Sequence, residues 1–324
     1  MQVVLDTRGL NISVRNHCFL IEVEKETRII HPQRISSILI TMPCRISSPA
    51  LILAAECQIP VVICNNCGKP LARIWSSRFL NTSTLRKKQY LYTTHEKSIN
   101  WFEEIVKLKI QGQIDNLWYV SNRKVSIKSQ VEKAEQDIHT QLSKFNVASN
   151  QDRVLHKKHL LFYEAYAAAQ YWQLIGIKLS TPFMFENRIK RDPTDAFNAC
   201  INYLYGMLRN QVEAAILSIG LDPALGVMHR DGYCLPSLVF DLMEPFRPII
   251  DRVLLTATLQ NQLKDDIMMI IENKHRINKA GRQQLIELFN NKLHSRVLFR
   301  GTTTSLQNQI LNEVKLLADK IKQV

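Results

Sequence analysis

Four side chains able to bind a metal ion or a phosphate group fall within residues 220–251, namely His229, Asp241, Glu244 and Arg247. An imidazole with two or three carboxylates suits Mn²⁺ or Mg²⁺, and a neighbouring guanidinium can bind a phosphate oxygen. Such a cation polarises a phosphoryl oxygen and offsets the charge that develops during displacement at phosphorus. The stretch therefore predicts most of a metal-dependent phosphodiester site.

A further carboxylate, Glu164, lies far upstream in the apolar, small-residue segment YEAYAAAQYW. A carboxylate on a helix face that packs against other helices is costly to bury unless it is paired or bound to a cation. The residues alone leave two interpretations open. Glu164 is either a buried ion-pair partner or the ligand that completes the site.

Proline and glycine residues predict how the chain presents His229. Asp222-Pro223 and Gly226 favour a break between two helices. His229 is therefore expected in a loop or at a strand end rather than in the middle of a helix.

The acids and the arginine are expected on the helix that follows. Asp241, Glu244 and Arg247 are spaced i, i+3 and i+6 and so share roughly one helix face. Pro245 and Pro248 must end, kink or restart this helix, because neither can donate an interior backbone hydrogen bond. The two carboxylates are thus expected at a helix end.

A second helix start is predicted at Asp192-Pro193, with Asp192 as the N-cap. Asn198 and Asn202 lie four residues apart on one face of that helix. Buried amides at this spacing usually tie helices together by hydrogen bonds, so a structural role is favoured over a ligand role.

Other motifs do not support a different chemistry. The sequence contains no P-loop, GxGxxG fingerprint, nucleophile elbow or HExxH. Cys64 and Cys67 form a single CxxC, without a second pair at zinc-ribbon spacing. Since Asn and Gly in NNCGKP suit a tight turn between strands, a turn is favoured over a metal site.

Composition indicates a globular protein of about two domains, since 46% of the 324 residues are hydrophobic and 22% are charged. The net charge of +13 favours a polyanionic partner. Residues 73–88 interleave basic side chains with aromatic ones, as in a phosphate-backbone contact or a solvated helix face. With no secretory leader and no apolar run near ~18 residues, a cytoplasmic protein with reduced cysteines and no membrane span is expected.

The chain is expected to have an α+β fold. Residues 2–42 alternate apolar and polar positions in short β-branched runs, SPALILAAECQ reads as a helix, and IPVVIC and LARIWSS as strands. Everything after about Asn81 reads as helical. We therefore expect a small N-terminal β domain over 1–85, built on an antiparallel sheet, followed by an all-α catalytic domain over 86–324.

Four blocks carry a resemblance: YEAYAAAQYW, RDPTDAFNACINYLYGML, GLDPALGVMH and DLMEPFRPIID. In this order they are similar to the CRISPR-associated integrase and endonuclease, the catalytic subunit of the spacer-acquisition complex (Cas-one family). The resemblance covers nearly the whole chain. It implies the same α+β fold, with a small β domain before a larger helical one.

The resemblance also assigns roles to residues. It implies that Glu164, His229 and Glu244 are the ligands of Mg²⁺ or Mn²⁺, that Asp241 is an acid close to the metal, and that Arg247 is a basic position beside it. Glu244 departs from the pattern, because many relatives carry the shorter Asp there. The extra methylene is expected to alter metal preference or geometry.

The reaction and partners that the resemblance implies are those of CRISPR adaptation, an antiviral defence. Each 3′-hydroxyl of a double-stranded protospacer would attack a phosphodiester of the CRISPR repeat by transesterification. The β domains would form a homodimer that pairs with a small Cas-two protein to hold the DNA. Two alternatives remain at this point: a transposase-type integrase outside CRISPR, and a non-catalytic basic scaffold for nucleic acid whose acids form ion pairs.

Overall fold

The computed structural model of the chain describes residues 1–23, 26–64, 70–74, 76, 83–121, 127–148, 153–179, 185–229, 235–263, 267–271 and 274–324. These residues form two compact units. The first unit comprises Met1–Lys87, Gly206–Asp222 and Asn290–Gln323, and the second comprises Lys88–Tyr205 and Pro223–Phe289. Each unit thus combines segments that are distant in the sequence, while the domain boundary expected near residue 85 stays a prediction.

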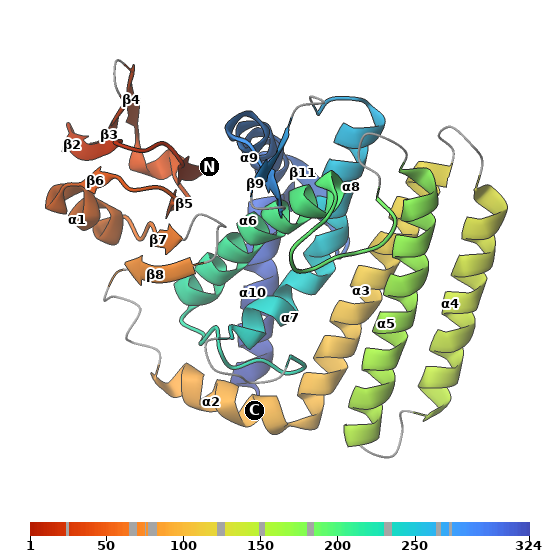
Figure 1. Ribbon diagram of the computed structural model, residues 1–324. Coiled ribbons are helices and arrows are strands. Elements are labelled where there is room, and N and C mark those ends of the chain that lie inside the picture. Colours follow the sequence, from red (N-terminus) through yellow and green to blue (C-terminus); the bar gives the residue numbers. More distant parts are fainter. Residues whose placement is uncertain are drawn as a thin grey trace. The chain divides into compact units, whose positions relative to one another are not determined.

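Two four-stranded sheets lie in the first unit (Figure 1). One has the order β1-β5-β7-β8 and is parallel except for the β7–β8 pair, and the other has the order β4-β3-β2-β6. The strands are β1 Gln2–Leu5, β2 Asn11–Arg15, β3 Cys18–Val23, β4 Glu26–Ile30, β5 Ser37–Ile40, β6 Arg45–Ile46, β7 Val61–Cys64 and β8 Pro70–Ile74. A 3-10 turn, η1 Pro32–Arg34, precedes β5.

Local sequence accounts for these elements. Asn16 and His17 have φ of 50° and 55°, which is the conformation that a two-residue turn between twisted strands requires. Helix α1 (Ser48–Glu56) begins where the Ser47 side chain accepts a hydrogen bond from the Ala50 backbone N–H, with proline in its first turn. The helix and strands predicted in this part of the chain are confirmed. The expected antiparallel sheet is wrong, because the pairs β1–β5, β5–β7 and β2–β6 are parallel. Cys67 and most of the turn predicted around it lie outside the described residues.

Within the first unit, side chains from the later segments contact the N-terminal strands. The Gln2 N–H donates to the Asn290 side-chain oxygen (3.1 Å), and the Asn290 amide donates back to the Gln2 carbonyl (3.2 Å). Arg73 of β8 pairs with Glu213, and both side chains are only 10% exposed. Arg73, one of the basic residues considered for phosphate binding, therefore serves a structural ion pair.

Helices make up most of the second unit (Figure 1). No helix in the described ranges combines the length and apolar character that crossing a bilayer requires. The helices after α1 are α2 Ser83–Thr94, α3 Glu96–Ser121, α4 Lys128–Ala148, α5 Arg153–Lys178, α6 Ala196–Ile219, α7 Ser237–Met243, the 3-10 turn η3 Glu244–Phe246, α8 Arg247–Leu259, α9 Lys279–His294 and α10 Leu306–Lys322.

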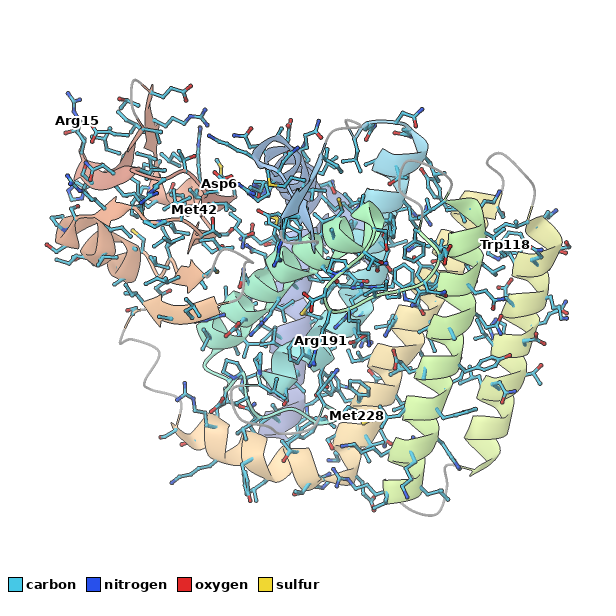
Figure 2. All side chains as sticks on the ribbon, in the orientation of Figure 1. Asp6, Arg15, Met42, Trp118, Arg191 and Met228 are labelled. Carbon is cyan, nitrogen blue, oxygen red and sulfur yellow. The ribbon has the colours of Figure 1, made fainter. Side chains whose placement is uncertain are left out.

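Helix α3 is the central element of the second unit and packs against α4, α5, α7, η3 and α8. Its buried residues recur every three or four positions, as expected for one helix face, and include Trp101, Ile105, Ile110 and Leu117. The C-terminal end of α3 is joined to α4 by Trp118 (labelled in Figure 2), whose indole N–H donates to Glu135 (2.9 Å).

A glycine sets the close approach of α3 to α8. A Cβ atom at Gly112 would lie 2.8 Å from the Cβ and 3.1 Å from the Cγ of Pro248. Neither contact is normal for carbon atoms, and the proline ring has little freedom to move. The missing side chain at Gly112 therefore lets the two helix backbones meet.

The predicted α+β class is confirmed, but the region after residue 81 is not entirely helical. Two short antiparallel hairpins interrupt it, β9–β10 and β11–β12, with strands β9 Met268–Ile271, β10 Lys274–Ile277, β11 Arg296–Phe299 and β12 Thr302–Ser305. The second hairpin turns at Arg300 and Gly301, which have φ of 45° and 74°. β-Branched residues beside a glycine turn favour this hairpin over a helix.

The predicted N-cap of α6 is wrong by three residues. The helix begins at Ala196, and the Asp195 carboxylate accepts the Asn198 backbone N–H (2.7 Å). Asp192 instead has a positive φ of 45°, which helical residues do not adopt. Aspartate was the correct residue type, but the helix is capped by the aspartate three residues further along the chain.

Candidate active site

Asp241 organises the loop that carries His229. Its carboxylate is fully buried and accepts backbone N–H groups from Val227 (2.6 Å), Met228 (3.2 Å) and His229 (3.2 Å). The same carboxylate lies 2.6 Å from Nδ1 of His229. With Asp241 ionised, Nδ1 carries the proton and Nε2 keeps a free lone pair, which is the tautomer that a metal-binding histidine needs.

The loop reaches Asp241 because residue 226 has no side chain. A Cβ atom at Gly226 would lie 2.7 Å from both the carbonyl carbon and the Cβ of Ser237, and 3.0 Å from Oδ2 of Asp241. The loop that precedes His229 thus lies directly on the start of α7. The predictions of a loop position for His229 and of a helix after it are confirmed, and that helix begins at Ser237.

The two prolines break the helix that carries the acids, as predicted. Helix α7 ends at Met243, Glu244 opens the single turn η3, and α8 begins at Arg247. Glu244 is 6% exposed. Its Oε1 lies 3.2 Å from Nε of Arg247 and 4.0 Å from Nε2 of His229.

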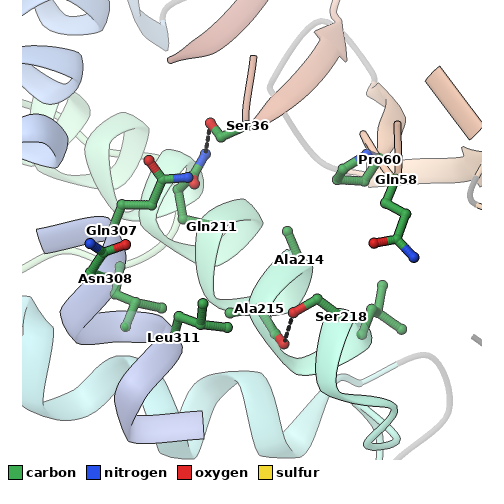
Figure 3. A pocket seen from close by; sticks show the side chains of 12 residues that line it. Ser36, Gln58, Pro60, Gln211, Ala214, Ala215, Ser218, Gln307, Asn308 and Leu311 are labelled. Atoms are coloured by element: carbon green, nitrogen blue, oxygen red, sulfur yellow. Dashed lines mark hydrogen bonds between the residues drawn. The ribbon is translucent and has the colours of Figure 1, made fainter. Parts of the chain in front are cut away.

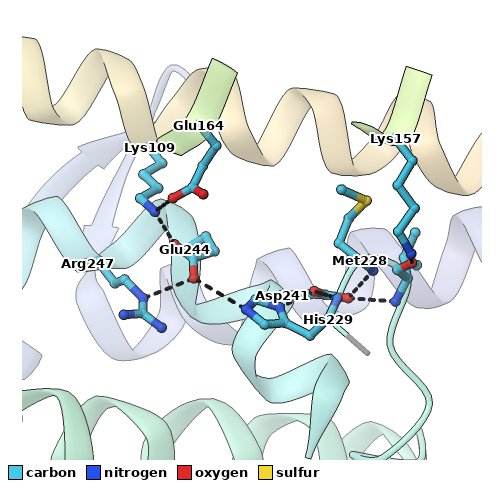
Figure 4. A network of polar contacts seen from close by, with 9 residues as sticks. Lys109, Lys157, Glu164, Met228, His229, Asp241, Glu244 and Arg247 are labelled. Carbon is cyan, nitrogen blue, oxygen red and sulfur yellow. Dashed lines mark hydrogen bonds and ion pairs between the residues drawn. The ribbon is translucent and has the colours of Figure 1, made fainter. Parts of the chain in front are cut away.

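Glu164 comes from α5 and meets Lys109 from α3. The Lys109 ammonium contacts Oε1 of Glu164 and lies 2.6 Å from Oε2 of Glu244 (Figure 4). The Lys109 side chain is 9% exposed, whereas that of Glu164 is 27% exposed. Both interpretations of Glu164 are therefore relevant: it takes part in an ion pair, and it stands beside the other predicted ligands.

The surrounding cations keep Glu244 ionised. Burial alone would raise the pKa of Glu244, but the charges of Arg247 and Lys109 outweigh it and lower the pKa to about 2. Burial would likewise lower the pKa of Lys109, yet Glu244 and Glu164 raise it above its ordinary value. Glu244, Lys109 and Arg247 are therefore all charged at neutral pH.

Glu164, His229 and Glu244, the predicted ligands, can be compared with what a divalent cation requires. Over the described part of the chain, no three His, Cys, Asp or Glu side chains already stand in a metal-holding arrangement, and the Lys109 ammonium lies between Glu164 and Glu244. Their chemistry nevertheless fits: two carboxylates and an imidazole are ligands for Mg²⁺ or Mn²⁺. The buried Oε2 of Glu244, which such a cation would use, is paired with the Lys109 ammonium at 2.6 Å.

A second cluster of polar side chains, also buried, lies next to Arg247. Asp251 of α8 accepts hydrogen bonds from the hydroxyls of Tyr205 (2.6 Å) and Tyr171 (3.2 Å). Burial raises the pKa of Asp251 to about 6, although both hydroxyls and Arg188 act against the rise. The Tyr205 ring also faces the Arg247 guanidinium at 4.9 Å. The hydrogen bond from Tyr205 to Asp251 thus holds the Tyr205 ring against the Arg247 guanidinium.

Arg188 fastens the segment before α6. Its guanidinium donates to the side-chain oxygens of Asn198 (2.9 Å) and Asn202 (2.6 Å), and Asn198 also donates to the Asn187 carbonyl (2.8 Å). The structural role predicted for the two asparagines is confirmed.

The site opens into a cleft of about 1000 Å³. Its lining combines the predicted residues with further polar and aromatic side chains, among them Lys109, Gln113, Glu164, Trp172, Arg188, Lys190, His229, Glu244 and Arg247. By contrast, a hollow of about 170 Å³ in the first unit is lined by amides, hydroxyls and apolar groups without a formal charge (Figure 3). The cleft is the better candidate for an anionic substrate because it brings cations together with ionised acids.

Four predicted residues, His229, Asp241, Glu244 and Arg247, are thus joined to one another by direct contacts, and Lys109 links Glu164 to them. The sequence reasoning missed Lys109. The signal was present, because Lys109 follows Ile105 by one helical turn on the buried face of α3.

Comparison with known proteins gives the family. A family model described as "CRISPR associated protein Cas1" matches residues 3–291. The chain belongs to the Cas1 family. The family expected from the four sequence blocks is thereby confirmed, and the match spans the ranges that contain every residue of the candidate site.

Two curated relatives show how far this Cas1-family chain has diverged. "CRISPR-associated endonuclease Cas1 1" of Archaeoglobus fulgidus is 26% identical over 325 residues, covering 96% of this chain and 93% of the relative. "CRISPR-associated endonuclease Cas1 2" of Saccharolobus solfataricus is 31% identical over 258 residues, covering 79% of this chain and 74% of the relative. The likeness to both therefore extends over most of each protein.

Solved structures support the fold. A casposase bound to its integration product has a TM-score of 0.84 at 22% identity, covering 99% of this chain and 90% of that one. A Cas1 protein from Thermotoga maritima has a TM-score of 0.79 at 21% identity, covering 99% and 97%. A Cas6-RT-Cas1–Cas2 complex has a TM-score of 0.78 at 19% identity, covering all of this chain and 35% of that one. At these identities the likeness concerns the fold alone.

Proposed function

We propose that this Cas1-family protein is a metal-dependent DNA endonuclease and integrase of CRISPR adaptation. The observation that carries the proposal is the arrangement around His229, whose Nδ1 is held by buried Asp241 while its Nε2 lies 4.0 Å from ionised Glu244. Family membership and the names of the curated relatives, which are called endonucleases, support the same activity.

Glu164, Glu244 and Nε2 of His229 would hold the Mg²⁺ or Mn²⁺ ion. When bound, this ion supplies Lewis-acid polarisation of the scissile phosphodiester and offsets the charge that develops on it. Asp241 keeps the imidazole in the required orientation and tautomer.

Arg247 is the residue proposed to bind a phosphate oxygen. It lines the cleft and lies against Glu244 on one side and over the Tyr205 ring on the other. A guanidinium fixed in this way offers its remaining N–H groups to a non-bridging or flanking phosphate oxygen. Water and a 3′-hydroxyl are both oxygen nucleophiles, so one site would serve both strand cleavage and strand transfer.

The substrates proposed are double-stranded DNA with 3′-hydroxyl ends and a CRISPR repeat. The excess of 42 Lys and Arg over 29 Asp and Glu favours binding to this polyanion. A homodimer through the N-terminal β domain and a Cas2 partner are part of the proposal, and one similar solved structure is a complex that contains Cas1 and Cas2.

The test is an integration assay with a labelled duplex and a repeat-bearing plasmid, run with Mg²⁺, Mn²⁺ or EDTA, and with and without the Cas2 partner. Glu164→Ala, His229→Ala and Glu244→Ala should each lower strand transfer by roughly 10³-fold or more, with DNA binding changed by less than about threefold. Removing the metal with EDTA should have the same effect.

Glu132→Ala is the matched control, because Glu132 is an exposed acid of α4 that contacts Lys128 at 4.0 Å. It should retain full activity. Activity that survives EDTA, or all three alanine variants, would show that these acids form structural ion pairs and take no part in catalysis. A lack of product with either metal would instead favour a non-catalytic scaffold.

A further inference from the structure

Lys109 occupies an unusual position for a lysine. It lies mid-helix on the buried face of α3, and its ammonium contacts one carboxylate from α5 and one from η3, those of Glu164 and Glu244. Lysine side chains normally extend to water because an ammonium group is strongly hydrated. The two carboxylates offset the cost of burying this one.

The two contacted carboxylates are also the proposed metal ligands. A metal ion bound by Glu164 and Glu244 would need the carboxylate oxygens that the Lys109 ammonium now contacts. Ligand oxygens lie about 2.0–2.1 Å from Mg²⁺, so the ion and the ammonium cannot both occupy the space between the two acids. The two cations therefore compete.

The charges within the site show what this exchange achieves. With His229 neutral, Glu164, Asp241 and Glu244 carry three negative charges, against two positive charges on Lys109 and Arg247. A divalent cation changes the sum from one negative to one positive charge, which matches a single phosphodiester. A loaded site would therefore attract a DNA phosphate more strongly than a metal-free one.

The displaced ammonium has an acceptor ready nearby. Gln113 lies one turn further along α3, lines the same cleft and is 4% exposed. Its Oε1 is buried and accepts no hydrogen bond, which is costly for an amide oxygen. Side chains four residues apart on a helix lie on the same face, so Lys109 can reach Gln113 by changing rotamer.

We propose that Lys109 is an internal counter-cation that holds the metal-free site together and that the metal ion displaces from Glu164 and Glu244 towards Gln113. This inference rests on the proposed function, since it presupposes the metal site. It gives Lys109 control over metal affinity, as a positioning residue for the two carboxylates.

The experiment is a calorimetric titration of the full-length protein with Mn²⁺, combined with melting temperatures with and without the ion. Lys109→Met should bind Mn²⁺ roughly tenfold more tightly than the unmodified protein, because the competitor is gone. Its metal-free melting temperature should fall by roughly 5 °C or more, because the buried Glu244 and the partly buried Glu164 carboxylates lose their counter-charge, and Mn²⁺ should restore it. Equal or weaker Mn²⁺ binding by Lys109→Met would overturn the proposal.

A second variant keeps the test decisive if Lys109→Met fails to fold. Gln113→Met removes the acceptor for the displaced ammonium and leaves both carboxylate contacts in place. It should weaken Mn²⁺ binding by roughly threefold or more, since the loss of one hydrogen bond to a charged group is of this size or larger. Unchanged Mn²⁺ affinity in Gln113→Met would also overturn the proposal.

Two further variants separate this inference from the proposed function. Lys107→Met removes a lysine of the same helix that is 44% exposed and contacts Glu103, and it should bind Mn²⁺ like the unmodified protein. His229→Ala should lose Mn²⁺ binding. If it does, the metal site exists, and a failed Lys109 result counts against the counter-cation alone. If His229→Ala binds Mn²⁺ normally, the metal site itself is wrong.

Discussion

Glu244 and Asp251 lie about two helical turns apart, and both are almost fully buried, at 6% and 1% exposure. Their partners differ in kind. Glu244 contacts the cations of Lys109 and Arg247, and its pKa falls to about 2. Asp251 contacts two tyrosine hydroxyls, and its pKa rises to about 6.

The difference shows how one short segment can provide both a reactive and a structural acid. A carboxylate that is surrounded by cations stays ionised, and one of those cations can be exchanged for a metal ion. A carboxylate that is held by neutral hydroxyls has no cation to exchange, and its hydrogen bonds fix the ring of Tyr205 beneath Arg247. The kind of partner, rather than the depth of burial, separates the two roles.

The largest effect expected from this comparison concerns catalysis. Glu244→Gln should lower metal-dependent strand transfer by roughly 10³-fold, because a neutral amide is a poor ligand for Mg²⁺. Asp251→Asn should stay within about tenfold of the unmodified protein, since the amide oxygen still accepts from one hydroxyl and the amide nitrogen can donate to the oxygen of the other. The two rates can be measured side by side in the integration assay, and equal losses would remove the distinction.

A third buried acid, Asp241, should give an intermediate effect. Asp241→Ala removes the acceptor for three backbone N–H groups and for Nδ1 of His229. Metal affinity or activity should fall by about 10–100-fold, as for other groups that orient a metal-binding histidine. Calorimetry with Mn²⁺ measures the first quantity. An Asp241→Ala protein that binds Mn²⁺ normally would mean that the loop positions His229 without this carboxylate.

The smallest effect is a pH dependence of stability. Because folding raises the pKa of Asp251 from 3.8 to about 6, the folded protein binds more protons than the unfolded chain between these values, and stability should increase as the pH falls from 7 to 5. The expected gain is about 1 kcal/mol. Glu244 adds nothing in this window, since its folded pKa of about 2 and its ordinary value of 4.5 both lie below it. Urea unfolding at both pH values should show this gain in the unmodified protein and lose it in Asp251→Asn; an identical pH dependence in both proteins would rule out Asp251 as its source.

Much of the fold could be predicted because local signals and tertiary structure agree. Ser47 and Pro49 start α1 where expected, and the prolines at 245 and 248 break the later helix. The β11–β12 hairpin was missed although Arg300 and Gly301 form its turn. Strand β11 (RVLF) has three apolar residues in a row and β12 (TTTS) has none, so neither strand shows the alternation of apolar and polar residues that marks a half-buried strand.

The site could be predicted as far as its residues had a recognisable order along the chain. His229, Asp241 and Glu244 fall close together, and the block around Glu164 added the last ligand. Lys109 could not be placed in the same way. A lysine on an apolar helix face ordinarily extends to solvent, and its burial here depends on two acids that only the tertiary fold brings to it.

The contact between Gly112 and Pro248 affects the charged residues of the site as well as the packing of the helices. Gly112 lies one turn from Lys109, and Pro248 follows Arg247 directly, so this contact fixes the spacing between helices that carry opposing charges of the site. A single methyl group at 112 would push them apart without touching any charged residue. A side chain gained at 112 would therefore require the loss of the ring at 248, so the spacing of the charged groups depends on two residues that take no part in the chemistry of the site.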